Sequence, residues 1–356
     1  MIKEVRLKDF RNHGSVSLAL GEGINLFYGD NGAGKTSLLE AVYVALKGRS
    51  FRHGDSADMV REGADCAVVM LSMAAGDVEH TLSRQLSRKG GTRLKLDGRE
   101  ETSGERMVPA GAEAFSQGNI DIIKGEPSRR RDWVDDLVAT CFAGAREVMG
   151  QYRKALYQRN EVLKAIRKGI AGKKESVPWE DILAEKGCEI LAWRKEALGF
   201  LEEEAGSMLK RKEESLRIGY YGTFEDEGDL REKMERFRDK EVMRGATMIG
   251  VHRDEIAFYL EGRNLKRKGS QGQQRVIAAL LTMAGSEFVK EKTGNPCLLM
   301  FDDLPSELDQ GTTSWLLEEI NKKGQVLITA NTNRLEDFNG WGARFFRVKP
   351  GAVEPR

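Results

Sequence analysis

The chain opens with short segments in which apolar and polar residues alternate. Residues 2–8 and 15–20 alternate in this way, and residues 24–28 form a continuous apolar run. A period of two is typical of half-exposed strands, whereas a short apolar run is typical of a buried one. These patterns predict a small antiparallel sheet beside a main sheet. Two hairpins are predicted further on, one joining residues 67–73 to 78–86 and one spanning 84–96.

The pattern becomes helical between residues 129 and 216, with one break at 169–178. Beyond it the spacing predicts a strand over 217–223, a helix over 229–243 and a strand over 255–260. Helices placed between two stretches of β structure indicate an insertion into one α/β domain. We therefore predict an α/β head over 1–127 and 246–356, with a short helical arm over 128–245.

A phosphate-binding motif follows the apolar run at 24–28 and precedes a predicted amphipathic helix. Its residues match G-x-x-x-x-G-K-[ST] and continue into that helix: Gly29, Asp30, Asn31, Gly32, Ala33, Gly34, Lys35, Thr36 and Ser37. In this motif glycines let backbone N–H groups face phosphate oxygens, and the helix adds its positive end. The pattern predicts that Lys35 reaches the β- and γ-phosphates of ATP and that the Thr36 hydroxyl binds Mg²⁺.

A second apolar run, 297–301, ends in Asp302 and Asp303. Carboxyl ends of parallel strands meet at one edge of a sheet, where the phosphate loop also lies. We expect Asp302 to hold Mg²⁺ and Asp303 to orient the attacking water, which makes Asp303 and Lys35 the candidate catalytic residues. A helix over 312–321 and a buried strand over 325–330 complete the predicted sheet.

A third stretch, from Gly269 to Arg275, places Ser270 and Gly272 at the start of a helix over 276–283. A helix N-terminus of this composition binds anions. Because the phosphate loop already supplies one cradle, we expect this second one to close on the nucleotide of another subunit. A turn is predicted over residues 9–14, and within it Arg11 and Asn12 are either nucleotide contacts or solvated turn residues.

Composition restricts the function further. The net charge is +1, so nucleic-acid binding requires local basic patches. One such patch is the second hairpin. Its cations either follow the phosphates of DNA or prevent another strand from pairing with this sheet edge. They are Arg84, Arg88, Lys89, Arg93, Lys95 and Arg99. Cations on the predicted arm are a solvated face or, alternatively, contact DNA or a partner. Four widely spaced cysteines and the lack of a long apolar run predict a cytoplasmic protein without a membrane segment.

Taken together, these motifs resemble the DNA-repair branch of the ABC ATPase superfamily with SMC-type heads, and most closely the RecF family of recombination mediators. The signature 269–275 together with Asp302-Asp303 and the D-loop 306–309 carries the resemblance, supported by Phe10-Arg11-Asn12 and His252-Arg253-Asp254. The resemblance assigns Gln117 to the Q-loop as a Mg²⁺ ligand, and gives Gln273 and Asp309 contacts to ATP. About 150 residues separate Gln117 from Ser270, so a helical hairpin there, rising about 1.5 Å per residue, is too short for an SMC coiled coil.

The resemblance implies an ATP-driven homodimer that clamps DNA, including single-strand gap junctions, and is released by slow, DNA-stimulated hydrolysis. It also implies a role in recombinational repair, with RecR and RecO, in the loading of RecA. Two alternatives remain open at this point. One is a dimer stapled by ATP without hydrolysis, and the other is an ABC-type ATPase of a defence or toxin system.

Overall fold

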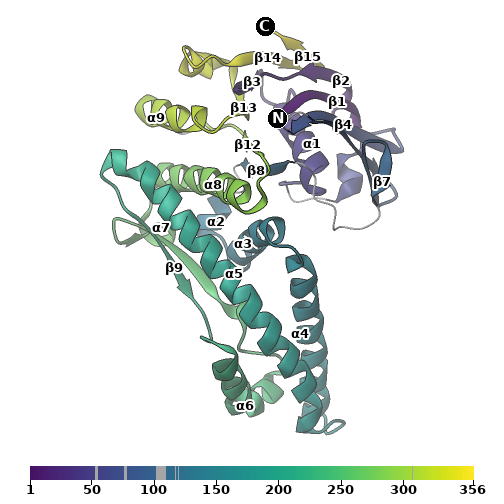
Figure 1. Ribbon diagram of the computed structural model, residues 1–356, viewed down its shortest axis with the longest axis vertical. Coiled ribbons are helices and arrows are strands. Elements are labelled where there is room, and N and C mark those ends of the chain that lie inside the picture. Colours follow the sequence, from purple (N-terminus) through teal and green to yellow (C-terminus); the bar gives the residue numbers. More distant parts are fainter. Residues whose placement is uncertain (53–54, 76–77, 102–109, 117, 119, 307) are drawn as a thin grey trace. The chain divides into compact units, whose positions relative to one another are not determined.

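The structure, a computed structural model, describes residues 1–52, 55–75, 78–101, 110–116, 118, 120–306 and 308–356. Contacts within the chain divide it into two compact units (Figure 1). Unit 1 comprises Met1–Ile120 and Ser270–Arg356, and unit 2 comprises Asp121–Gly269. The second unit is therefore inserted into the first, as the sequence pattern predicted.

The first sheet of unit 1 is antiparallel, with the strand order β2-β1-β4-β5-β6-β7. Its strands are β1 Ile2–Phe10, β2 His13–Ala19, β4 Cys66–Ala75, β5 Val78–Ser87, β6 Thr92–Leu96 and β7 Arg99–Glu101. The predicted small sheet and both hairpins are confirmed. Strand β1 continues through residues predicted as a turn, because Phe10 is fully buried and pairs with His13. Only Arg11 and Asn12 remain in the turn.

The second sheet of unit 1 is mostly parallel, with the order β15-β14-β3-β13-β12-β8. Its strands are β3 Ile24–Tyr28, β8 Gly111–Phe115, β12 Cys297–Phe301, β13 Val326–Ala330, β14 Arg344–Lys349 and β15 Ala352–Pro355, of which β15 alone pairs antiparallel. The apolar run 24–28, the predicted buried strand 325–330 and the apolar run 297–301 correspond to the adjacent strands β3, β13 and β12. Since they are parallel neighbours, the loops after them share one edge of the sheet.

Helix α1 (Lys35–Lys47) packs between the two sheets of unit 1. The sequence predicted an amphipathic helix, but every residue from Ser37 to Leu46 is buried. A helix covered on both sides has no solvent face, which explains its apolar composition. The other helical segments of this unit are α8 Gln271–Thr293, α9 Gln310–Asn321, η1 Ser56–Met59 and η6 Thr332–Phe338.

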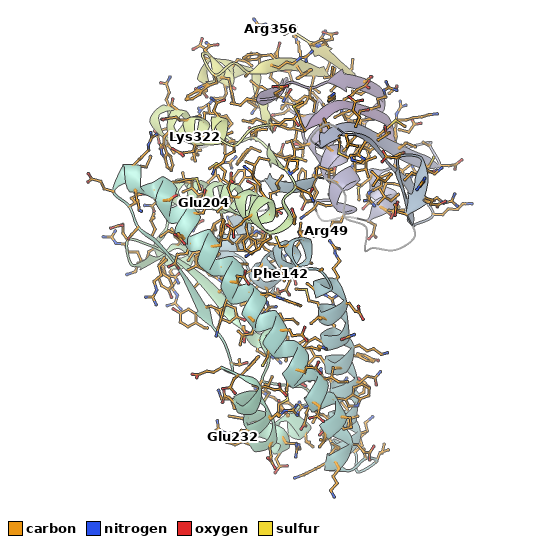
Figure 2. The ribbon with its side chains drawn as sticks, viewed as in Figure 1. Arg49, Phe142, Glu204, Glu232, Lys322 and Arg356 are labelled. Atoms are coloured by element: carbon orange, nitrogen blue, oxygen red, sulfur yellow. The ribbon has the colours of Figure 1, made fainter. Side chains whose placement is uncertain are left out.

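Unit 2 is built on long helices, and Figure 1 shows α4 (Ala145–Arg167) beside α5 (Val177–Leu209). The remaining helical segments are α3 Pro127–Cys141, α6 Glu227–Arg244, the short α7 Leu265–Lys268, η3 Lys173–Ser176, η4 Lys210–Lys212, η5 Val251–Arg253 and α2 Ile120–Lys124, which begins at the unit boundary. The predicted helical hairpin is present, with an additional break after α3. There Phe142, labelled in Figure 2, stacks on Trp193 of α5 with ring centroids 5.6 Å apart.

Unit 2 also contains a three-stranded antiparallel sheet, ordered β11-β10-β9. Its strands are β9 Leu216–Tyr221, β10 Glu255–Leu260 and β11 Arg263–Asn264. The expected arm boundaries, 128 and 245, differ from those observed at Asp121 and Gly269. The unit extends to Gly269 because β10 pairs along its whole length with β9.

The His252-Arg253-Asp254 motif lies inside unit 2 and has a structural role there. The Asp254 carboxylate is fully buried and accepts hydrogen bonds from the Tyr220 hydroxyl and, at 3.0 Å, from the Thr223 backbone N–H. His252 Nδ1 lies 2.9 Å from the Tyr152 hydroxyl. Within the described part of the chain, no helix is both long and apolar enough to span a membrane.

Candidate nucleotide-binding site

The ammonium group of Lys35 is enclosed by the loop that precedes it. Its Nζ donates to the carbonyl oxygens of Gly29 at 2.7 Å and Asp30 at 2.9 Å, and to Asn331 Oδ1 at 3.1 Å. Burial lowers the pKa of Lys35, and the nearby charges of Asp303 and Asp302 oppose this shift. The cation is thus positioned at the sheet edge by three neutral acceptors, which an anionic ligand can replace or supplement.

Gly34 allows the loop to turn into α1. Its φ of 106° lies in the left-handed region, and a Cβ atom there would meet Asn12 Nδ2 at 2.5 Å and His13 Nε2 at 2.6 Å. His13 Nε2 donates to the Gly34 carbonyl at 3.1 Å, and Asn12 Nδ2 donates to the Ala33 carbonyl at 3.3 Å. The β1–β2 turn therefore supports the phosphate loop directly, and only glycine fits this closely.

Asp302, at the end of β12, faces the first turn of α1. Its carboxylate accepts from Thr36 Oγ1 at 2.7 and 3.0 Å and from Thr329 Oγ1 at 2.8 Å. Burial raises the pKa of the Asp302 carboxyl, while the two threonine hydrogen bonds lower it. A hydroxyl and a carboxylate placed together supply oxygen ligands of the kind that Mg²⁺ prefers.

Asp303 has a strained backbone that is held by its neighbours. Its φ is 55°, which is uncommon for a residue with a side chain. The Asp303 N–H donates to Thr329 Oγ1 at 2.8 Å, and the buried Arg275 guanidinium donates to the carbonyls of Asp303 and Leu304. Arg275 lies in the first turns of α8, so the signature helix is tied to the loop after β12 within one chain.

Arg11 is held at the site by a buried carboxylate of α1. Its Nη2 and Nε donate to Glu40 at 2.7 and 3.0 Å, and Glu40 also accepts from Ser50 Oγ at 2.6 Å. Glu40 is fully buried, and Arg52 lies 3.7 Å away. The guanidinium of Arg11 is therefore fixed at the rim of a cavity that Lys35 and Asp302 also line.

These groups surround one open cavity of about 1370 Å³ in unit 1. Ten residues predicted from the sequence line it: Arg11, Asn12, Asn31, Gly32, Gly34, Lys35, Thr36, Ser37, Asp302 and Asp303. Gly29 and Asp30 contribute carbonyl oxygens to Lys35 from outside the lining, and Ala33 is buried behind the loop.

Four other predicted residues are outside this lining: Ser270, Gly272, Gln273 and Asp309. Ser270 caps α8, where its hydroxyl accepts from the Gln273 N–H at 3.2 Å and Gln273 Oε1 accepts from the Ser270 N–H at 3.0 Å. Gly272 follows within the first turn, and Asp309 caps α9 by accepting from the Thr312 N–H at 2.9 Å. Gln117 lies outside the described residues.

Several residues that line the cavity were not predicted from the sequence as parts of a nucleotide site. They are Arg52, Ala57, Asp58, Val60, Arg61, Glu62, Arg88, Ser116, Gly118, Thr329 and Asn331. Thr329 and Asn331 could have been found, since they end and follow a buried strand at the same sheet edge as Asp302. The segment 57–62 carries no recognisable motif, so only the folded structure shows that its residues lie beside the cavity.

The structure corrects part of the basic hairpin hypothesis. Arg84 is buried and donates through Nε to the Ala45 carbonyl at 3.1 Å, so it supports α1 and does not offer its charge to a ligand. Arg88 donates to the Ala64 carbonyl at 2.8 Å and lines the cavity. The other four cations of this hairpin are exposed, and for them both roles are still open: Lys89, Arg93, Lys95 and Arg99.

Comparisons with known proteins agree with this geometry. The family described as RecF/RecN/SMC N terminal domain matches residues 1–341. The DNA replication and repair protein RecF of Symbiobacterium thermophilum is 32% identical, over 99% of this chain and 97% of that relative. A solved structure of the recombination mediator protein RecF with ATP has a TM-score of 0.86 and 27% identity, covering 100% of this chain and 99% of that one.

An Smc head domain from Pyrococcus furiosus has a TM-score of 0.57 and 17% identity, covering 100% of this chain and 95% of that one. At this identity the likeness concerns the fold alone. It agrees with an ABC-ATPase head, in which a phosphate-loop sheet and an antiparallel sheet carry an inserted helical unit. The phosphate loop, the paired aspartates and the match along the whole chain lead to one conclusion: the chain belongs to the RecF family of SMC-like ABC ATPases.

Proposed function

We propose that the protein is an ATP-switched dimer that clamps DNA during replication and repair. The observation that carries this proposal is the pairing of Thr36 with Asp302 next to the enclosed Lys35, because phosphoryl transfer needs a metal and a cation at one place. The solved relative bound to ATP supports the choice of nucleotide. ATP then occupies the cavity of unit 1, with its phosphates on the N–H groups of residues 29–37.

We further propose that Thr36 and Asp302 hold Mg²⁺, with Gln117 as a third ligand. The metal would neutralise charge on the β- and γ-phosphates. The described residues contain no group of three or more His, Cys, Asp and Glu side chains suited to a metal. A site with one carboxylate, a hydroxyl and phosphate oxygens is the usual arrangement for Mg²⁺.

The dimer is proposed from the position of the signature. Ser270 and Gln273 are exposed at the N-terminus of the 23-residue helix α8, and Ser270 is outside the lining of the cavity. An exposed helix N-terminus is suited to the γ-phosphate of a second subunit's ATP. Asp309 in the D-loop would contact the same interface. Loss of the γ-phosphate would then release the two subunits.

Hydrolysis is proposed to be slow and to be stimulated by DNA. Asp303 is shorter than a glutamate, so its carboxylate lies farther from an attacking water. The proposed role of the dimer is to mark single-strand gap junctions with RecR and to assist RecA loading together with RecO. The solved relative is described as belonging to the RecFOR pathway, which supports these partners. A role on DNA with these partners implies that the protein works in the cytoplasm.

Sedimentation tests this proposal. Wild-type protein with ATP is expected to sediment as a dimer, and more completely with gapped DNA, whereas Lys35→Ala remains a monomer in both. The Asp303→Asn variant is expected to remain trapped on DNA after ATP addition. A wild-type monomer under all conditions would refute the clamp. A dimer whose lifetime on DNA is unchanged by Asp303→Asn would support an ATP-stapled dimer without a hydrolytic switch.

A further inference from the structure

The outer face of the small sheet in unit 2 carries a pair of contacting tyrosines. Tyr221 of β9 and Tyr259 of β10 approach each other with their hydroxyl oxygens 2.8 Å apart. Alternate residues of β10, Ile256, Phe258 and Leu260, are buried on the opposite face. The two tyrosines therefore belong to the face that is not used for packing.

The Tyr221 ring lies over Gly219 of its own strand. A Cβ atom placed on Gly219 would be 2.9 Å from the ring carbon Cε2 and 3.0 Å from the hydroxyl oxygen. Ala257 pairs with Gly219 in the register, so small residues form the sheet surface beneath the rings. One ring face is covered by the strand, yet 51% of Tyr221 remains exposed. The hydroxyl contact restrains both rings, which reduces the entropy lost when a ligand stacks on them.

One cation lies beside this tyrosine pair on the same face of the sheet. Arg217 pairs with Tyr259 in the register and is exposed on the same face. The β10–β11 hairpin and α7 carry further exposed cations, Arg263, Lys266, Arg267 and Lys268. Arg263 pairs with Leu260 and so lies on the packed face, and Lys266 donates to the Gly125 carbonyl at 2.9 Å. The neighbouring Glu261 accepts from the Ser215 N–H and hydroxyl, and Glu255 is paired with Arg130 at 2.7 Å.

We propose that Tyr221 and Tyr259 form a stacking platform for the bases of single-stranded DNA, with Arg217 and the α7 cations contacting its phosphates. An aromatic face beside a row of cations is the arrangement that binds single strands without sequence preference. A duplex does not fit this chemistry, because its base faces are already stacked on one another. The site lies wholly within unit 2 and contains none of the ATP-binding residues, so it goes beyond the proposed clamp and does not need ATP.

The platform is tested by binding of fluorescein-labelled oligo(dT) to nucleotide-free protein, measured by anisotropy. Replacing both rings, with Tyr221→Leu and Tyr259→Leu, is expected to weaken binding by about tenfold or more, since each stacked base contributes about five- to 150-fold. An abasic oligonucleotide of the same length should bind wild type as weakly as oligo(dT) binds this double variant. Tyr221→Phe keeps the ring but loses the hydroxyl contact, so its affinity should lie between those of wild type and the double variant.

Two single variants sharpen the result. Gly219→Ala keeps both tyrosines but lifts the Tyr221 ring from the strand, so it should weaken oligo(dT) binding. Tyr157→Leu removes a tyrosine of α4 that is 63% exposed and should have no effect. The platform is refuted if wild type does not bind oligo(dT), if it binds the abasic strand equally well, or if the double variant loses self-association and not DNA binding. ATP-dependent binding of duplex DNA, measured in parallel, should survive in the double variant, so failure of the clamp and failure of the platform are distinguishable.

Discussion

The hydroxyl oxygen of Thr36 lies 2.7 Å from a carboxylate oxygen of Asp302, although 266 positions separate the two residues in the chain. Strand β13 lies between β3 and β12 in the sheet, so the contact joins the first turn of α1, the helix that follows β3, to the residue after a non-adjacent strand. Thr329, at the end of that middle strand, donates to the same carboxylate. The parallel sheet thus assembles the proposed metal site from three separate segments.

Asp302→Asn is expected to lower ATP hydrolysis by about a hundredfold or more, because a metal ligand contributes several kcal/mol to charge stabilisation. The same variant should stabilise the nucleotide-free protein at pH 7. Burial raises the pKa of this carboxyl, so its ionised form opposes folding, and that penalty begins as the pH rises through the unfolded pKa. Urea denaturation without ATP should show the gain at pH 7 and a smaller one at acidic pH. Equal gains at both pH values would mean that burial of the ionised carboxylate is not the source of the gain.

Gly34→Ala is expected to destabilise the nucleotide-free protein by about 1–3 kcal/mol, which is the usual cost of a side chain in a strained backbone region. The new methyl group would also displace Asn12 and His13 from the loop. Gly32→Ala is the matched control, because Gly32 also has a positive φ, of 81°, but its Cβ would meet nothing within 4 Å. Urea denaturation should show a larger loss for Gly34→Ala. Equal losses would mean that the β1–β2 turn does not support the loop.

The sequence could predict the two sheets and half of the site because those features have local signals. The phosphate loop and the paired aspartates follow apolar runs, and Ser270 opens a helix, so each position can be recognised from its neighbours. The positions of Arg88 and Asp58 at the cavity could not be found in this way, since they reach it only when η1 packs against β5, which packs beside α1. Likewise, Arg84 appears as one more hairpin cation until its contact with the Ala45 carbonyl is known.

The stability of unit 2 is expected to fall in acid because of His252. Burial lowers the pKa of this histidine from 6.5 to about 4. The neutral ring therefore contributes stability that is present above pH 6.5 and is lost as the pH falls towards 4, with a maximum of about 3 kcal/mol. His252→Gln should flatten the pH dependence of the free energy of unfolding in this window. An unchanged slope in His252→Gln would show that the ring is not buried as described.

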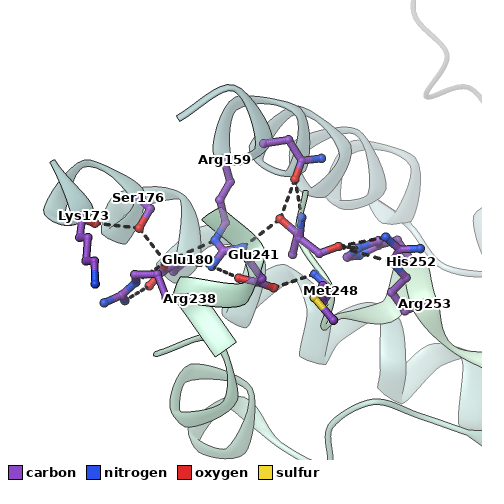
Figure 3. Close-up of polar contacts among 11 residues, drawn as sticks. Arg159, Lys173, Ser176, Glu180, Arg238, Glu241, Met248, His252 and Arg253 are labelled. Atoms are coloured by element: carbon purple, nitrogen blue, oxygen red, sulfur yellow. Dashed lines mark hydrogen bonds and ion pairs between the residues drawn. The ribbon is translucent and has the colours of Figure 1, made fainter. Parts of the chain in front are cut away.

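A buried cluster of charges joins three helices of unit 2 (Figure 3). Arg159 of α4 is fully buried and lies 3.0 Å from Glu180 of α5 and 2.6 Å from Glu241 of α6. Burial opposes ionisation of Glu180, but hydrogen bonds from Arg238 and Ser176 and the charge of Arg159 keep its pKa low. The cluster therefore depends on Arg159 to balance two carboxylates.

Removing that cation with Arg159→Met is expected to destabilise unit 2 by about 3–5 kcal/mol, because Glu241 would remain buried without its partner. Arg238→Met is the control, since Arg238 is partly exposed and pairs only with Glu180 among the described residues; its cost should be about 1 kcal/mol or less. Adding Glu241→Gln to Arg159→Met should recover part of the loss, and urea denaturation followed by far-ultraviolet circular dichroism measures all three variants. If Arg159→Met costs no more than Arg238→Met, packing of the helices rather than charge balance holds this end of the unit together.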